Sequence, residues 1–137
     1  MAEARSLETF PLHLGLGATA VPQPAFTGPE FTGMEWYAVY GARHDGDGAE
    51  GRLVAMHSFT ESWTSWEMHP LGAEVVVCTA GEITLIQELA GGSHARITLG
   101  IGDYAVNPPG VWHTADVAAS ATALFITCGM GTEGRAR

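Results

Sequence analysis

The sequence of 137 residues contains no lysine, and its six basic residues are scattered arginines. The absence of lysine excludes Schiff-base chemistry and any lysine nucleophile. With 15 acidic residues, the chain has a formal net charge of −9, whereas a surface that binds phosphate groups needs clustered positive charge. We therefore expect no nucleic acid and no anionic membrane among the partners of this protein.

Long apolar runs are also missing. No segment reaches the roughly 18 consecutive apolar residues that cross a bilayer, and the N-terminus has no basic region followed by an apolar stretch. These absences predict a soluble, cytoplasmic protein. Cysteine is scarce, and Cys78 and Cys128 each lie in an apolar, strand-like run. We expect two buried thiols there rather than a disulfide or a nucleophile.

The composition favours a globular fold, because 46% of the residues are hydrophobic and only 15% are charged. The length favours a single domain, because a second domain would have too little chain. Residues 1–33 are rich in proline and lack a sustained period, which predicts an irregular N-terminal arm. Short apolar pieces of this arm can pair along a sheet edge. We expect a single barrel domain at 34–130 and a C-terminal tail at 131–137 that frays.

Short runs of strand-favouring residues follow one another from Met34 onward, with turn signals about every 8–12 residues. We expect about eight or nine strands and no helix, and hence an all-β fold, either a sandwich or a barrel. The expected strands include 36–40 and 52–59, with a hairpin loop between them at 44–51.

Ligand-type side chains gather in two stretches of the sequence. Glu67, His69 and Glu74 lie within eight positions, and His113 follows a rigid Pro-Pro-Gly turn. Residues two apart on a strand share a face, so Glu67 and His69 point the same way, and a tight turn can bring Glu74 back opposite His69. Imidazole nitrogen and carboxylate oxygen suit a divalent first-row metal ion. These four residues are therefore a candidate ligand set.

Both stretches resemble the signature motifs of the cupins, small jelly-roll β-barrels. The first family motif, G-x5-H-x-H-x3-4-E-x6-G, is met by Glu67-x-His69-x4-Glu74-x6-Gly81, and the second, G-x5-P-x-G-x2-H-x3-N, by Gly102-x5-Pro108-x-Gly110-x2-His113. The resemblance covers roughly residues 50–128. It implies a double-stranded β-helix (jelly-roll) barrel that holds one divalent ion, which can be Fe, Mn, Zn or Ni.

The chain departs from the motifs at three positions. Glu61 and Val117 stand where the motifs have a glycine and an asparagine, and Glu67 stands where the family has its first histidine. If Glu67 binds, two imidazoles and two carboxylates surround the ion and neutralise a 2+ charge. If it does not, the other three residues form a facial triad, and Glu67 is left beside the substrate as a possible general base. A third possibility is that the metal has been lost.

Strand alternation also sorts the side chains around this stretch. Trp63 and Ser65 share the face of Glu67 and are expected to line the pocket. Trp66, Met68 and Trp112 are expected to point outward. Large outward residues need a cover, which suggests a homodimer interface, as small cupins commonly form.

The remaining histidines are expected to play no part in the site. His57 alternates with apolar residues, which predicts a hydrogen-bonded core histidine. His13 is expected at the surface, and His44 and His94 are expected in solvated turns.

The resemblance implies a metal-dependent enzyme in which the ion acts as a Lewis acid on a small organic molecule. Dioxygenase, decarboxylase, isomerase and lyase chemistry all remain open. The alternatives are a non-catalytic module that binds or senses a small ligand, and a purely structural or storage domain. Because basic groups are few, neutral or aromatic substrates are favoured over strongly anionic ones.

Overall fold

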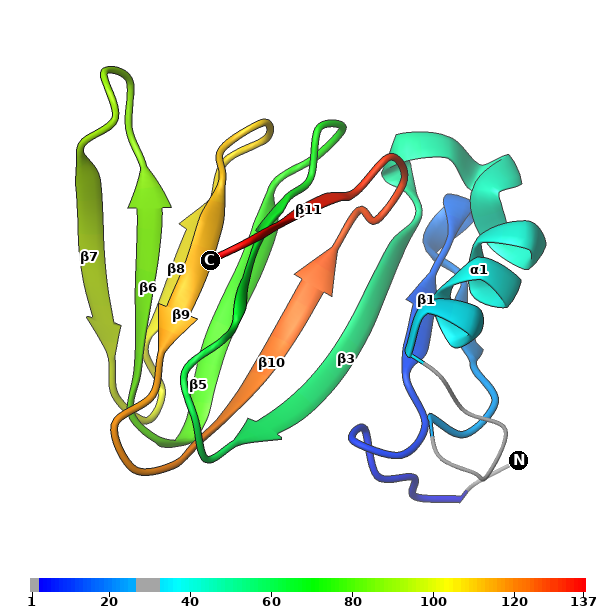
Figure 1. Cartoon of the computed structure of the whole chain (residues 1–137). Helices are drawn as coiled ribbons and strands as arrows, with labels where there is room; N and C mark the ends of the chain where they lie inside the picture. Colours follow the sequence, from blue (N-terminus) through cyan, green and yellow to red (C-terminus); the bar gives the residue numbers. More distant parts are fainter. Residues whose placement is uncertain (1–2, 27–32) are drawn as a thin grey trace.

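The protein is built from two facing antiparallel sheets (Figure 1) in a computed structural model that describes residues 3–26 and 33–137. The central strands run in the order β3-β10-β5-β8 in one sheet and β4-β9-β6-β7 in the other. This is the strand order of a jelly roll, so the predicted all-β jelly-roll barrel is confirmed. The strands are β3 (Arg52–Phe59), β4 (Ser65–Met68), β5 (Glu74–Gly81), β6 (Ile83–Glu88), β7 (His94–Leu99), β8 (Tyr104–Asn107), β9 (His113–Asp116) and β10 (Ala121–Thr127).

The main core lies between the two sheets, where alternate residues of each strand point inward. Val76 and Cys78 from one sheet meet Ile83 and Leu85 from the other, and all four are fully buried. Both cysteines are free and buried, as predicted. Gly81 ends β5 with φ +67°, and a Cβ there would lie 2.0 Å from the carbonyl oxygen of Ser120. This close approach explains the glycine that closes the first motif.

The N-terminal arm extends one sheet at its edge. Strand β1 (Leu12–Leu14) pairs with β3 and with β2 (Ala20–Pro22), and a 3-10 turn, η1 (Leu16–Ala18), connects β1 and β2. The arm therefore pairs along a sheet edge as its apolar pieces suggest, and its described part is more regular than predicted. Residues 1–2 and 27–32 of the predicted arm lie outside the described residues.

The prediction of a strand at 36–40 is wrong, because this stretch belongs to helix α1 (Gly33–His44), which continues into a 3-10 segment, η2 (Asp45–Glu50). The predicted hairpin loop at 44–51 is wrong for the same reason. Aromatic residues favour strands, but Trp36, Tyr40 and His44 are also four positions apart, which places them on one face of a helix. Their rings are successive neighbours, with centroids 5.7 and 5.2 Å apart. This face packs on β3 through the buried Leu53.

The prediction of a surface position for His13 is also wrong. His13 is only 2% exposed, because β1 carries it beneath α1 and η2. Its Nδ1 lies 2.6 Å from the Tyr40 hydroxyl, and its Nε2 lies 2.7 Å from the Asp47 carboxylate. His44, expected to be solvated, is half-buried and stacks on the His13 ring at 3.9 Å. We call His13, Tyr40, His44 and Asp47 the His13 cluster, and it fastens the helical segment to the arm.

The C-terminal tail does not fray. Strand β11 (Glu133–Ala136) pairs antiparallel with β4, which would otherwise expose an unpaired edge. The guanidinium of Arg135 lies 5.3 Å from the Trp66 ring centroid and 4.5 Å from that of Trp112. The tail thus covers outward-facing tryptophans for which a dimer partner was expected, so they no longer argue for a homodimer. No helix in the described ranges is both long enough and apolar enough to cross a membrane.

Candidate metal centre

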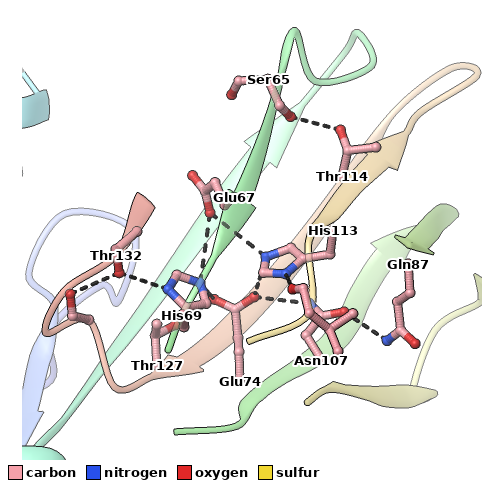
Figure 2. A network of polar contacts seen from close by, with 12 residues as sticks. Ser65, Glu67, His69, Glu74, Gln87, Asn107, His113, Thr114, Thr127 and Thr132 are labelled. Atoms are coloured by element: carbon pink, nitrogen blue, oxygen red, sulfur yellow. Dashed lines mark hydrogen bonds and ion pairs between the residues drawn. The ribbon is translucent and has the colours of Figure 1, made fainter. Parts of the chain in front are cut away.

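The jelly roll brings all four predicted ligands together at one end of the barrel (Figure 2). Glu67 on β4 pairs directly with His113 on β9, and Glu74 opens β5. His69 follows β4, and its carbonyl oxygen accepts a hydrogen bond of 2.9 Å from the backbone N–H of Gly110. The turn of the second motif is therefore tied to the first motif, which fixes the approach of His113.

Glu74 lies between the two histidines. Its two oxygens are each 3.2 Å from an imidazole Nε2, one from His69 and the other from His113. Two ligands about 2.1 Å from an ion and about 90° apart are separated by about 3 Å, so these distances suit a shared ion. Glu67 is farther away, with one oxygen 3.9 Å from each Nε2 and a side chain that is 41% exposed.

The hydrogen bonds of the imidazoles fix their tautomers. Thr132 donates its hydroxyl hydrogen to the Gly129 carbonyl, so its oxygen is free to accept from Nδ1 of His69 at 2.8 Å. Nδ1 of His113 lies 3.3 Å from the carbonyl oxygen of Val111, which can only accept. Because both rings carry hydrogen on Nδ1, each neutral ring presents the Nε2 lone pair to the carboxylates.

These two Nε2 atoms are buried and have no hydrogen-bond partner among the described residues. Lone pairs that face a carboxylate only 3% exposed, that of Glu74, repel it unless a cation lies between them. This cation can be either a proton bound to one of the imidazoles or a metal ion. The set of two nitrogens and two carboxylates suits a divalent first-row ion, so the residues present fit the metal that the motifs imply.

A second layer of polar residues holds Glu74 in place. Its oxygens accept hydrogen bonds from Asn107 Nδ2 at 3.1 Å and from Thr127 Oγ1 at 2.6 Å. Gln87 in turn donates to the Asn107 side chain at 2.9 Å. Supporting contacts of this kind orient metal ligands. The sequence interpretation missed these residues, although strand alternation places Gln87 on the same face of β6 as the buried Ile83 and Leu85.

The charges of the site shift the pKa values of its members. Burial alone would raise the pKa of Glu74, but the contacts with His113 and His69 hold it well below its ordinary value. For His69, burial acts to lower the pKa, and the neighbouring Glu74 and Glu67 outweigh it and raise the pKa. Partial burial and then the charge of Glu74 raise the pKa of Glu67. Glu67 is thus the carboxylate of the set that takes up a proton more readily.

The two predicted pocket residues differ in their surroundings. The ring centroid of Trp63 lies 6.3 Å from that of His113, and its indole Nε1 is buried without a hydrogen-bond partner in the described part of the chain. Ser65 lies farther along β4 in Figure 2, where its backbone carbonyl accepts a hydrogen bond from Thr114. Trp63 therefore adjoins the candidate centre, whereas the hydrogen bond of Ser65 joins β4 to β9.

His57 differs from its prediction as a hydrogen-bonded core histidine. Its half-buried ring lies among Phe26, Phe59 and Phe125, with centroids 5.4 to 6.4 Å away, and its side chain makes no hydrogen bond within residues 3–26 and 33–137. Burial lowers its pKa, so it is neutral at pH 7. His94 is exposed, as predicted, but it opens strand β7 instead of lying in a turn.

A second group of ligand-type atoms, from His13, His44 and Asp47, also lies within 4.8 Å of one another. It does not fit a metal ion. Both ring nitrogens of His13 already have hydrogen-bond partners, Tyr40 and Asp47, and the two imidazoles are stacked with an interplanar angle of 17°. Lone pairs in nearly parallel rings cannot converge on one ion. The His13 cluster is therefore structural.

Comparison with solved structures identifies the fold. An oxalate oxidase aligns over 67% of this chain and 50% of its own length, at 18% identity and a TM-score of 0.55. A cupin-2 domain protein from Shewanella frigidimarina aligns over 56% of this chain and 69% of its own length, at 20% identity and a TM-score of 0.48. Hydroquinone 1,2-dioxygenase from a Sphingomonas species aligns over 56% of this chain and 59% of its own length, at 18% identity and a TM-score of 0.49. No protein-family model and no curated protein matches the sequence. The chain has the cupin fold, as its motifs predict.

Proposed function

From the cupin fold and the convergence of Glu67, His69, Glu74 and His113, we propose that this protein is a metal-dependent enzyme acting on a small organic molecule. The observation behind the proposal is the pair of buried, unpartnered Nε2 lone pairs that face the Glu74 carboxylate. The oxalate oxidase that shares the fold acts on a small molecule, as its name states, and this supports a small substrate here.

In this proposal His69, Glu74 and His113 hold the ion, which when bound supplies Lewis-acid chemistry. Glu67 stands apart from them by its greater distance, its exposure and its raised pKa. A carboxylate of raised pKa close to the substrate suits proton transfer. We therefore assign Glu67 the role of general base, positioned to take a proton from substrate held beside the ion.

Elemental analysis of protein purified without chelators or a histidine tag tests metal binding. We expect close to one divalent ion per chain, and a large loss of metal in His113→Ala. His94→Ala is the matched control, because His94 is exposed on β7, and it should keep the metal content of the wild type. Substoichiometric metal in the wild type would contradict the proposal.

The role of Glu67 is tested with Glu67→Gln, which keeps the shape of the side chain but cannot accept a proton. We expect this variant to retain its metal and to lose turnover by about 10²–10⁴-fold, as for a general base. Loss of metal together with turnover would make Glu67 a ligand. Full metal occupancy without turnover in the wild type would favour the alternative, a module that binds a small ligand. Cytoplasmic location and a homodimeric state stay predictions.

A further inference from the structure

A connected row of aromatic rings leads away from the candidate metal centre. Trp63 lies beside His113 and packs against Phe125, with ring centroids 6.1 Å apart. Phe125 in turn packs against His57, with centroids 5.8 Å apart. The ring centroid of His57 lies 5.4 Å from that of Phe26, and the Phe26 centroid lies 5.5 Å from that of Tyr37 on α1. Phe59 packs against Trp63, His57 and Phe125. The row therefore combines rings from the arm, the helix and the barrel.

The far end of the row is Tyr37 of α1, whose ring contacts Phe26 and Trp36. Tyr37 is 41% exposed, yet partial burial and the charges of Glu67 and Glu74 raise its pKa to about 12. Tyr37 keeps its proton at neutral pH, so its hydroxyl adds a hydrogen-bond donor and no charge.

The row contains a fully buried hydrogen-bond donor without a partner within the described ranges. Trp63 Nε1 is buried and makes no hydrogen bond in the described part of the chain, like the Nε2 atoms of His69 and His113. A buried donor without an acceptor is costly, and an indole N–H can only donate. A ligand oxygen that accepts this hydrogen bond would satisfy it. Trp63 also borders an open groove of about 310 Å³ along residues 58–64, which places this side of the row next to solvent.

No arginine contact is found at the candidate centre among the described residues. Arg96 and Arg137 pair with Asp116, Arg135 pairs with Glu88, and Arg43 donates to Gln23. A second anionic group on a substrate would therefore meet Glu67 and Glu74 without a compensating side-chain cation. This charge pattern disfavours dicarboxylates and favours a substrate with no more than one anionic group.

Resting on the proposed function, we propose that the substrate is a small aromatic molecule with an oxygen-bearing group and no more than one anionic group. Its ring packs against the aromatic row, and an oxygen next to the ion accepts a hydrogen bond from Trp63 Nε1. Trp63 is in this case a specificity-determining residue, since it recognises both the ring and the oxygen.

Zinc-loaded protein, which is diamagnetic, allows a test with benzoate and acetate as probes. The two share a carboxylate and differ only in the ring. By calorimetry we expect benzoate to bind at least about tenfold more tightly than acetate, since ring burial adds to the affinity. Phe59→Leu should remove most of this preference and leave acetate binding unchanged. Equal affinities for the two probes would overturn the proposal.

The hydrogen bond of Trp63 is tested separately. Trp63→Phe keeps a ring and removes the donor, so we expect benzoate to bind about five- to tenfold more weakly. Trp112→Phe, on the outer face beneath Arg135, is the control and should bind benzoate like the wild type. In ¹⁵N-labelled wild-type protein, one of the four indole N–H resonances, the one absent from Trp63→Phe, should move downfield when benzoate is added.

The outcomes separate this inference from the proposed function. If the wild type does not hold zinc, both fail. If it holds zinc but shows no ring preference, or if no indole resonance moves, only the inference fails. Should Trp63→Phe not fold, the wild-type titration decides, because at least one of four indole resonances must shift if Trp63 donates to the probe.

Discussion

At the scale of single residues, the site depends on where a few hydrogens sit. The hydroxyl of Thr132 is committed to Gly129, so His69 must donate to it and keep its Nε2 lone pair free. The strand pattern predicts that Glu67 and His69 share a side, but it contains no information about Thr132, which lies 63 residues away from His69 in the chain. The residues that support a ligand are thus less visible in the sequence than the ligand itself.

Thr132→Val should weaken metal binding by about 10–100-fold, because Nδ1 of His69 loses the acceptor that holds the ring and its tautomer. Competition against a chromophoric chelator measures the affinity. Thr98→Val, an exposed threonine on β7, is the matched control and should bind like the wild type. An unchanged affinity in Thr132→Val would show that the tautomer of His69 does not depend on this contact.

At the scale of elements, the predictions for α1 and for the C-terminal tail are wrong for a common reason, because both segments are stabilised by partners far away in the sequence. The aromatic residues of α1 fit both a strand and a helix, and the decision lies in packing of Trp36 on β3. The tail contains glycine and reads as frayed, yet the free edge of β4 pairs with it. Local propensity cannot register either contact.

The His13 cluster should make the attachment of α1 sensitive to acid. Burial, His13 and Arg43 lower the pKa of His44, and Asp47 offsets part of this shift. Since the folded-state pKa lies below the unfolded value of about 6.5, His44 stabilises the folded state above pH 6.5 and loses this contribution as the pH falls below it. Amide hydrogen exchange in α1, corrected for its intrinsic pH dependence, should therefore accelerate between about pH 6.5 and 5.

His44→Gln cannot be protonated and should remove much of this acceleration, whereas His94→Gln on the exposed strand β7 should keep it. His57 has a lowered pKa as well and contributes in the same direction from β3. Exchange in α1 that is independent of pH in the wild type would argue against the cluster as the sensitive element.

At the scale of the whole molecule, the fold and half of the site follow from the sequence. The all-β class follows from the strand-favouring runs, and the jelly roll follows from the resemblance to the cupin motifs. The convergence of Glu67, His69, Glu74 and His113 is predictable because ligand types recur at fixed spacing on strands whose alternation fixes their side. Asn107 and Gln87 could not be placed in the same way, because their roles arise only where β8 and β6 meet the end of the barrel. The aromatic row was equally hidden, since its members come from three separate segments.

The closing of the barrel end around one cation should make stability depend on metal. If free zinc is 100 times its Kd, binding stabilises the folded state by about 2.7 kcal/mol, which raises the Tm of a domain of this size by about 10 °C. Differential scanning calorimetry with zinc and with a chelator measures the difference. His113→Ala should melt at the same temperature under both conditions, and His94→Ala should respond like the wild type. A wild-type Tm that is identical with zinc and with chelator would mean that protonated imidazoles, and not a metal ion, separate the His69 and His113 nitrogens from Glu74.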